Sequence, residues 1–103
     1  MKVLFKDWEC TAVGTTYAEN GRKAIVLRDS ETGEPVATAT VNLADVRIPD
    51  NCVFVKDYSE NEGMLDTLYN HGIVESGAIV EVKSGYVFIS AYRLTQEAIN
   101  NLF

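Results

Sequence analysis

The place where the chain turns from strand to helix is the feature that most limits its fold. The run from Cys52 to Val55 is apolar and β-like, and a polar, acidic stretch from Lys56 to Leu65 follows it directly. Within that stretch, Ser59 followed by Glu62 matches a capping box, in which a hydroxyl and a carboxylate pair with backbone N–H groups at a helix start. The spacing predicts a three-turn helix over about residues 60–70, which ends before Gly72.

Short strand-like segments fill most of the chain before this helix. The pair Asn20-Gly21 predicts a tight hairpin, because both residue types tolerate a positive φ. The polar stretch 29–35 predicts a second turn, with a glycine and a proline as its markers. Residues 3–5 form a short β-like run, and the expected strands before the helix are residues 8–14, 24–27, 36–43 and 52–55.

The part of the chain after the helix returns to strands. We expect strands over residues 78–82 and 86–94 with a turn at Ser84-Gly85, and Thr95 is placed to cap a closing helix over residues 96–103. Because short turns join most neighbouring strands, the prediction is an α+β fold with one mainly antiparallel sheet of about six strands. The expected order is β-β-β-β-α-β-β-α in a single domain over residues 1–103, with the central helix against one face.

Charge and hydropathy exclude several classes of function. The formal net charge is -6, which argues against direct nucleic-acid binding, since phosphate contacts need a surplus of Lys and Arg. The same charge permits a partner with a basic surface, or no partner at all. No stretch reaches the ~20 apolar residues that span a bilayer, and the first residues lack the apolar core of a signal peptide. We therefore expect a cytoplasmic protein without membrane association.

Residues that could carry catalysis are few. His71 is the single histidine and follows the predicted helix, where an interaction with the helix C-terminus is favoured over catalysis. Cys10 and Cys52 lie in apolar, strand-like contexts and are predicted to be buried, reduced thiols. A Cys–His dyad would need the fold to bring one of them beside His71. Zinc-ligand spacings, phosphate-binding glycine loops and nucleophile elbows do not occur. No catalytic residue, metal ligand or cofactor site is predicted.

The densest run of acid is the best candidate for a contact surface. Helix capping explains Ser59 and Glu62, but other acidic side chains around them remain unexplained. A solvated helix face is the alternative interpretation. A divalent metal site is a third, although the spacing is not that of an EF-hand. The predicted partner surface consists of Asp57, Tyr58, Glu60, Glu62 and Asp66.

Two sequence blocks carry a resemblance to a known family. They are Thr38 to Leu43, which reads TATVNL, and Ser59 to Leu65, which reads SENEGML. With the Asn20-Gly21-Arg22 turn, they make the chain resemble an uncharacterised family of small single-domain proteins, often found in gut bacteria and on their plasmids, conjugative elements and phages. The family carries no assigned activity, so the resemblance implies a mobile-element setting and no site residues.

Three functions remain open at this point. The pattern favours a small non-enzymatic, protein-binding accessory protein of a mobile element or phage, with counter-defence as one possible role. An enzyme or small-ligand binder with an unrecognised site is the first alternative, and a pocket joining Cys52, His71 or the acids would favour it. An oligomerising structural protein is the second alternative, built through an open sheet edge or through Leu102 and Phe103.

Overall fold

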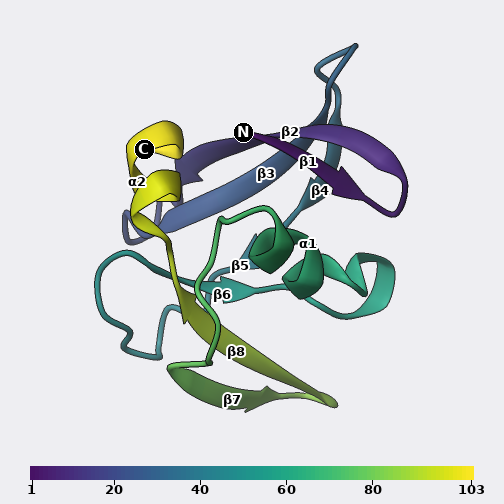
Figure 1. Ribbon diagram of the computed structural model, residues 1–103. Coiled ribbons are helices and arrows are strands. Elements are labelled where there is room, and N and C mark those ends of the chain that lie inside the picture. The colour runs from purple at the N-terminus through teal and green to yellow at the C-terminus, as the bar shows by residue number, and fades with distance from the viewer.

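The first half of the chain forms an antiparallel meander. The computed structural model describes residues 1–103, and its first sheet has four strands in chain order, β1-β2-β3-β4 (Figure 1). The predicted hairpin around Gly21 is confirmed, because the chain reverses between Tyr17 and Arg22 and Gly21 adopts a φ of 70°. The strands are β1 (Lys2–Phe5), β2 (Trp8–Thr16), β3 (Lys23–Asp29) and β4 (Pro35–Thr38).

A second antiparallel sheet of four strands has the order β5-β6-β8-β7 and lies beside the first sheet (Figure 1). The α+β class is confirmed, whereas the prediction of one sheet of about six strands is wrong. The strands are β5 (Thr40–Val41), β6 (Cys52–Val55), β7 (Val80–Ser84) and β8 (Val87–Arg93).

The extra sheet arises at Ala39, inside the segment predicted as one strand over residues 36–43. Ala39 is fully buried; its N–H donates to the carbonyl of Ile25, and its own carbonyl accepts from the N–H of Lys56. The chain thus leaves the first sheet after Thr38 and enters the second at Thr40. A run of threonine, valine and alanine suits a strand on either side of such a junction, so its pattern does not reveal the change of sheet.

The central helix begins later than the capping box predicted. Residues Ser59–Asn61 form a single 3₁₀ turn, and the α-helix α1 spans Met64–Asn70. Ser59 has a φ of 56° rather than an extended N-cap conformation, and it lies inside the 3₁₀ turn, whose N-cap is Tyr58. Instead, the Asp57 carboxylate accepts hydrogen bonds from the backbone N–H groups of Gly63 (2.7 Å) and Leu65 (3.2 Å). The capping-box interpretation of Ser59 and Glu62 is therefore wrong, and Asp57 holds the helix start.

We predict that Asp57→Ala lowers the free energy of unfolding by about 1 kcal/mol, the usual cost of losing a side chain that satisfies helix N-terminal N–H groups. Ser59→Ala serves as the control and is expected to change stability little, because Ser59 is the N-cap of neither the 3₁₀ turn nor α1. Urea unfolding of the two variants measures both values. A larger loss for Ser59→Ala than for Asp57→Ala would contradict this assignment.

The main core lies where α1 and both sheets meet. Met64 and Leu68 of α1 and Ile73 after it are fully buried, and they belong to one cluster with residues of both sheets. A smaller core on the other face of the second sheet is built on Phe54 and Ile89, and the segment between β5 and β6 packs on it. Neither helix has the length and apolar composition needed to cross a bilayer.

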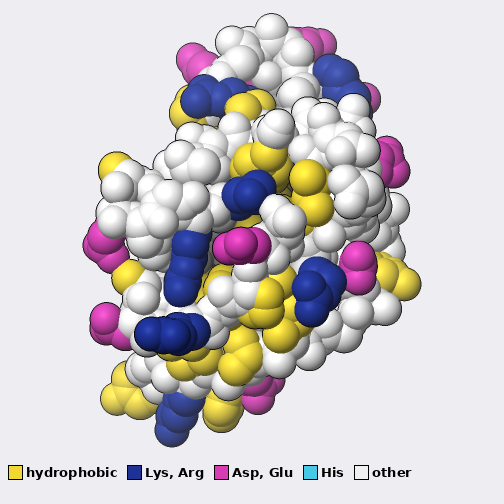
Figure 2. Space-filling model, turned by 90° about the vertical axis from the view of Figure 1, so that its left-hand side faces the viewer, with side chains coloured by type: hydrophobic (Ala, Val, Ile, Leu, Met, Phe, Trp, Pro, Cys, Tyr) yellow, Lys and Arg dark blue, Asp and Glu magenta, His cyan; other side chains and the backbone are white.

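The closing helix α2 (Gln96–Leu102) packs on the first sheet. The predicted cap is confirmed, because the Thr95 hydroxyl accepts a 3.0 Å hydrogen bond from the Ala98 N–H. Lys23 places its ammonium 5.6 Å from the centre of the Phe103 ring. Figure 2 shows the side of the molecule that carries α2, where Lys and Arg side chains lie between hydrophobic ones.

Candidate functional site

The structure places the five residues predicted as a partner surface in different surroundings. Tyr58 is half-buried and packs against the smaller core, and Asp57 is engaged by the start of α1. Glu60 forms a 2.7 Å ion pair with Lys56. Glu62 and Asp66 are exposed and make no side-chain hydrogen bond or ion pair. The five side chains therefore differ in whether they are free to contact a partner or are already buried or bonded within the protein.

The Lys56–Glu60 pair accounts for the acid nearest the 3₁₀ turn. Its hydrogen bond raises the pKa of Lys56 above its usual value and lowers the pKa of the Glu60 carboxyl. Lys6 also reaches this turn, donating from its ammonium to the backbone carbonyl of Glu60 at 2.9 Å. Two cations thus lie close to Glu60, which makes this part of the predicted surface the least attractive to a basic partner.

Two adjoining hollows lie between α1, β8 and the segment that follows α1; together we name them the aromatic groove. The first hollow has a volume of about 300 Å³ and the second about 190 Å³. Both are lined by Leu65 and Tyr92, which form the wall between them. The first is also lined by Asp66, Tyr69, Glu75, Ser76, Gly77 and Ala78, and the second by Val55, Asp57, Phe88 and Ser90.

The groove lies beside β8, where one face of the strand is only partly covered. Alternation along β8 puts Phe88, Ser90 and Tyr92 on the same face, opposite Ile89 and Ala91 of the smaller core. Tyr92 packs against the main core, whereas Phe88 remains 64% exposed. On α1, Tyr69 is 52% exposed. Two large aromatic side chains thus lie open beside the groove.

Unpaired acids line the first hollow. The carboxylates of Asp66 and Glu75 make no hydrogen bond and no ion pair, since Lys56–Glu60 is the single salt bridge of the molecule. In the second hollow the carboxylate of Asp57 already accepts two backbone N–H groups. The free negative charge of the groove therefore lies at its first hollow. Sequence reasoning identified Asp66 but missed Glu75, Tyr69, Phe88 and Tyr92.

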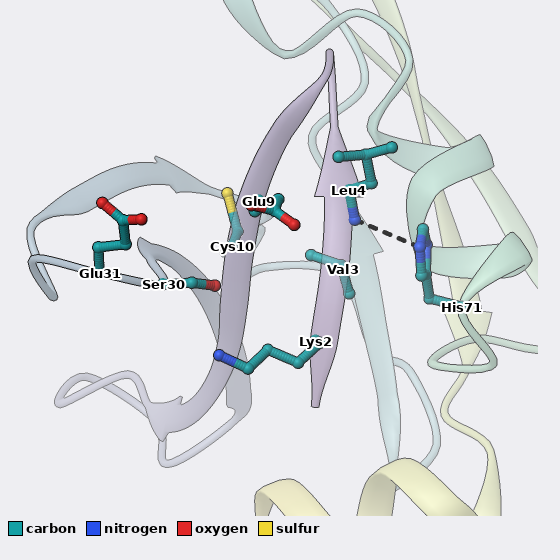
Figure 3. A pocket seen from close by; sticks show the side chains of 8 residues that line it. All are labelled: Lys2, Val3, Leu4, Glu9, Cys10, Ser30, Glu31 and His71. Atoms are coloured by element: carbon teal, nitrogen blue, oxygen red, sulfur yellow. Dashed lines mark hydrogen bonds between the residues drawn. The ribbon is translucent and has the colours of Figure 1, made fainter.

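A larger surface cavity of about 610 Å³ lies where β1 and β2 meet the end of α1 (Figure 3). Both Cys10 and His71 line it, but β1 passes between them and the thiol does not point toward the imidazole (Figure 3). Both nitrogens of His71 are occupied. Its Nδ1 lies 2.8 Å from the Thr67 carbonyl, and its Nε2 accepts the Leu4 N–H at 3.2 Å. The hydrogen bonds assign the proton to Nδ1 and confirm the predicted role of His71 at the end of α1.

The two thiols are free and buried, as predicted. Burial raises the pKa of Cys10, and Asp29 raises it further. Burial also raises the pKa of Cys52, although Arg93 acts in the opposite direction. A raised pKa disfavours the thiolate, which is the nucleophilic form of cysteine. Neither thiol has the surroundings of an activated nucleophile.

Asp29 is the most strongly perturbed carboxylate in the molecule. The indole Nε1 of Trp8 donates to its Oδ2 at 2.8 Å, and the backbone N–H groups of Glu31 and Thr32 donate to its Oδ1. These bonds, led by that of Trp8, lower the pKa of Asp29 to about 2. Because all these donors lie on strand β2 or the β3–β4 turn, the perturbation is explained by the turn structure and needs no ligand.

The candidate site is defined by the structure alone, without help from related proteins. No protein-family model, curated protein or solved structure matches this chain. No group of three or more His, Cys, Asp or Glu side chains is placed to hold a metal ion. The candidate site is therefore the aromatic groove, with its exposed aromatic side chains and its two unpaired carboxylates, Asp66 and Glu75.

Proposed function

We propose that this protein is a small non-enzymatic, protein-binding module that holds a partner with a basic surface against the aromatic groove. The observation that carries the proposal is that one groove is lined both by the unpaired carboxylates of Asp66 and Glu75 and by the exposed side chains of Tyr69 and Phe88. Exposed apolar patches with polar rims are typical of protein interaction sites. Aromatic side chains are enriched among the residues that dominate binding energy at such sites.

The charge of the molecule supports a basic partner. The formal net charge of -6 and the acids of the first hollow act in the same direction on an approaching cation. Complementary charge of this kind chiefly raises the rate of association and selects among partners. The buried contact area of the aromatic residues then supplies most of the affinity.

The biological setting of the proposal comes from the family resemblance of the TATVNL and SENEGML blocks. We place the protein in the cytoplasm, as an accessory protein of a mobile element or phage. Blocking a host protein through its basic surface, as a counter-defence protein would, is the role that fits this setting. The Cys10–His71 geometry favours binding over catalysis, since the thiol is buried and both imidazole nitrogens are occupied.

Affinity capture from bacterial lysate tests the proposal. The double variant Asp66→Lys with Glu75→Lys reverses the charge of the first hollow, and we expect it to lose the partner that the unchanged protein retains. Glu31→Lys with Glu34→Lys is the matched control, because it changes the net charge equally at exposed positions of the β3–β4 turn. Equal recovery of the partner by the groove variant and the unchanged protein would show that this surface is not the binding site.

A further inference from the structure

We infer that the partner presents one short segment whose Lys or Arg side chain occupies the first hollow and whose neighbouring apolar side chain occupies the second. The inference rests on the proposed function and deepens it by naming the chemistry of the occupant. It follows from three features of the groove: a difference in free charge between the hollows, a difference in their lining, and the wall that the hollows share.

The first hollow has the features of a site for a cation. Asp66 and Glu75 line it with carboxylates that no side chain of the protein neutralises. The rings of Tyr69 and Tyr92 line the same hollow, and an ammonium or guanidinium is attracted to the face of an aromatic ring. Carboxylates can also accept charge-assisted hydrogen bonds from the same cation. A Lys or Arg side chain satisfies both kinds of group at once.

The second hollow suits an apolar side chain. Val55, Leu65 and Phe88 line it, and Phe88 presents most of its ring to solvent. The one acid there, Asp57, already accepts the N–H groups of Gly63 and Leu65. A cation at this position would gain less from Asp57 than from the free carboxylates of the first hollow. Covering Phe88 with an aliphatic or aromatic side chain removes apolar surface from water, which is the larger gain here.

The shared wall indicates that both side chains come from one segment. Leu65 and Tyr92 line both hollows, so the two occupants lie on either side of these two residues. Side chains from separate parts of a partner would each need independent ordering. A short segment that carries both side chains loses less conformational entropy for the same contacts.

Amide NMR titration with short blocked peptides tests the inference. One set carries an arginine and a leucine one, two or three positions apart. Matched sets replace the leucine with serine or the arginine with glutamate. We expect at least one arginine–leucine peptide to shift the signals of residues in both hollows, and both matched sets to bind more weakly. Equal binding by a matched set, shifts confined to other surfaces, or no shifts at millimolar peptide would overturn the inference.

Substitutions in each hollow test the two binding roles separately. Asp66→Asn with Glu75→Gln should weaken an arginine–leucine peptide about three- to tenfold at low ionic strength, the range expected for one or two exposed ion pairs. Phe88→Ser should weaken the arginine–leucine peptide but not the arginine–serine peptide. Groove signals that shift with protein concentration alone would show a second copy of the chain in the groove and overturn the inference. Because capture from lysate uses whole partners, it can succeed where these peptides fail, so the two failures are distinguishable.

Discussion

Gly14→Ala is expected to destabilise the protein by about 2 to 3 kcal/mol, the upper part of the range for inserting a methyl group into a well-packed place. A Cβ at this position would lie 2.2 Å from the carbonyl oxygen of Leu102 and 2.8 Å from Cε1 of Phe103. The oxygen belongs to the backbone, so no change of rotamer relieves the overlap. The last turn of α2 must move away from β2, and the half-buried Leu102 side chain moves with it.

The expected loss of stability is opposite in sign to the effect that backbone propensity alone predicts for Gly14→Ala. In the interior of a strand, alanine is usually more stable than glycine by roughly 0.5 to 1 kcal/mol, because glycine loses more backbone entropy on folding. Gly14 pairs with Ile25 inside the β2–β3 ladder and is not among the residues with a positive φ. Local propensity alone therefore predicts that Gly14→Ala stabilises, whereas the contact with α2 predicts the opposite.

Urea unfolding of four proteins decides between the two. They are the unchanged chain, Gly14→Ala, a chain without Leu102 and Phe103, and the shortened chain with Gly14→Ala. In the shortened chain we expect the substitution to be neutral or slightly stabilising, because the atoms that the new methyl group would meet are gone. An equal loss of stability in both backgrounds would mean that the close approach of α2 is not the cause.

The parts of the fold that the sequence predicts well are those that local chemistry determines. The turn around Asn20-Gly21 follows from the tolerance of these residues for positive φ, and Gly21 does adopt it. The start of α2 follows from the hydroxyl of Thr95, which accepts the N–H of Ala98 as a capping side chain does. Each of these features depends on residues that are close together in the chain.

The errors in the fold occur where groups outside the local pattern decide the outcome. Ala39 changes sheets because its N–H and carbonyl find Ile25 and Lys56, which lie far from it in the sequence. Ser59 is displaced as a cap because Asp57 reaches the same helix start from two positions earlier. A capping-box pattern cannot show that another carboxylate in the same stretch competes for those N–H groups.

The candidate site was predicted only in part for the same reason. Asp66 was identified from the density of acid around the helix, but Glu75, Phe88 and Tyr92 reach the groove from outside that stretch. A signal for Phe88 is present in the sequence, because aromatic and aliphatic residues occupy both faces of residues 86–92. The pattern alone does not reveal which face another element covers. In the structure Phe88 remains largely exposed.

Asn61→Ala is expected to lower the free energy of unfolding by about 2 to 3 kcal/mol, the upper part of the range for leaving a buried polar group unsatisfied. Asn61 is only 2% exposed, and its Nδ2 donates a 2.7 Å hydrogen bond to the carbonyl of Thr38. Thr38 is the last residue of β4, directly before the junction at Ala39. Asn61 therefore ties the 3₁₀ turn to the place where the chain changes sheets, which explains a buried asparagine in an otherwise acidic, exposed stretch.

The comparison with Asn61→Asp isolates the hydrogen bond from packing. Aspartate has nearly the same shape, but above its pKa it replaces the amide donor with a charged acceptor that faces the Thr38 carbonyl. We expect Asn61→Asp to be less stable than Asn61→Ala at neutral pH, because a buried charge without a partner costs more than a missing group. Its stability should recover in part as the pH falls and the carboxyl is protonated, because the acid can then donate to Thr38.

Glu62→Ala, at the exposed neighbouring position, is the control and should change little. If Asn61→Asp were as stable as the unchanged protein at neutral pH, the junction would not depend on this hydrogen bond, and the burial of Asn61 would have to be explained by its shape alone.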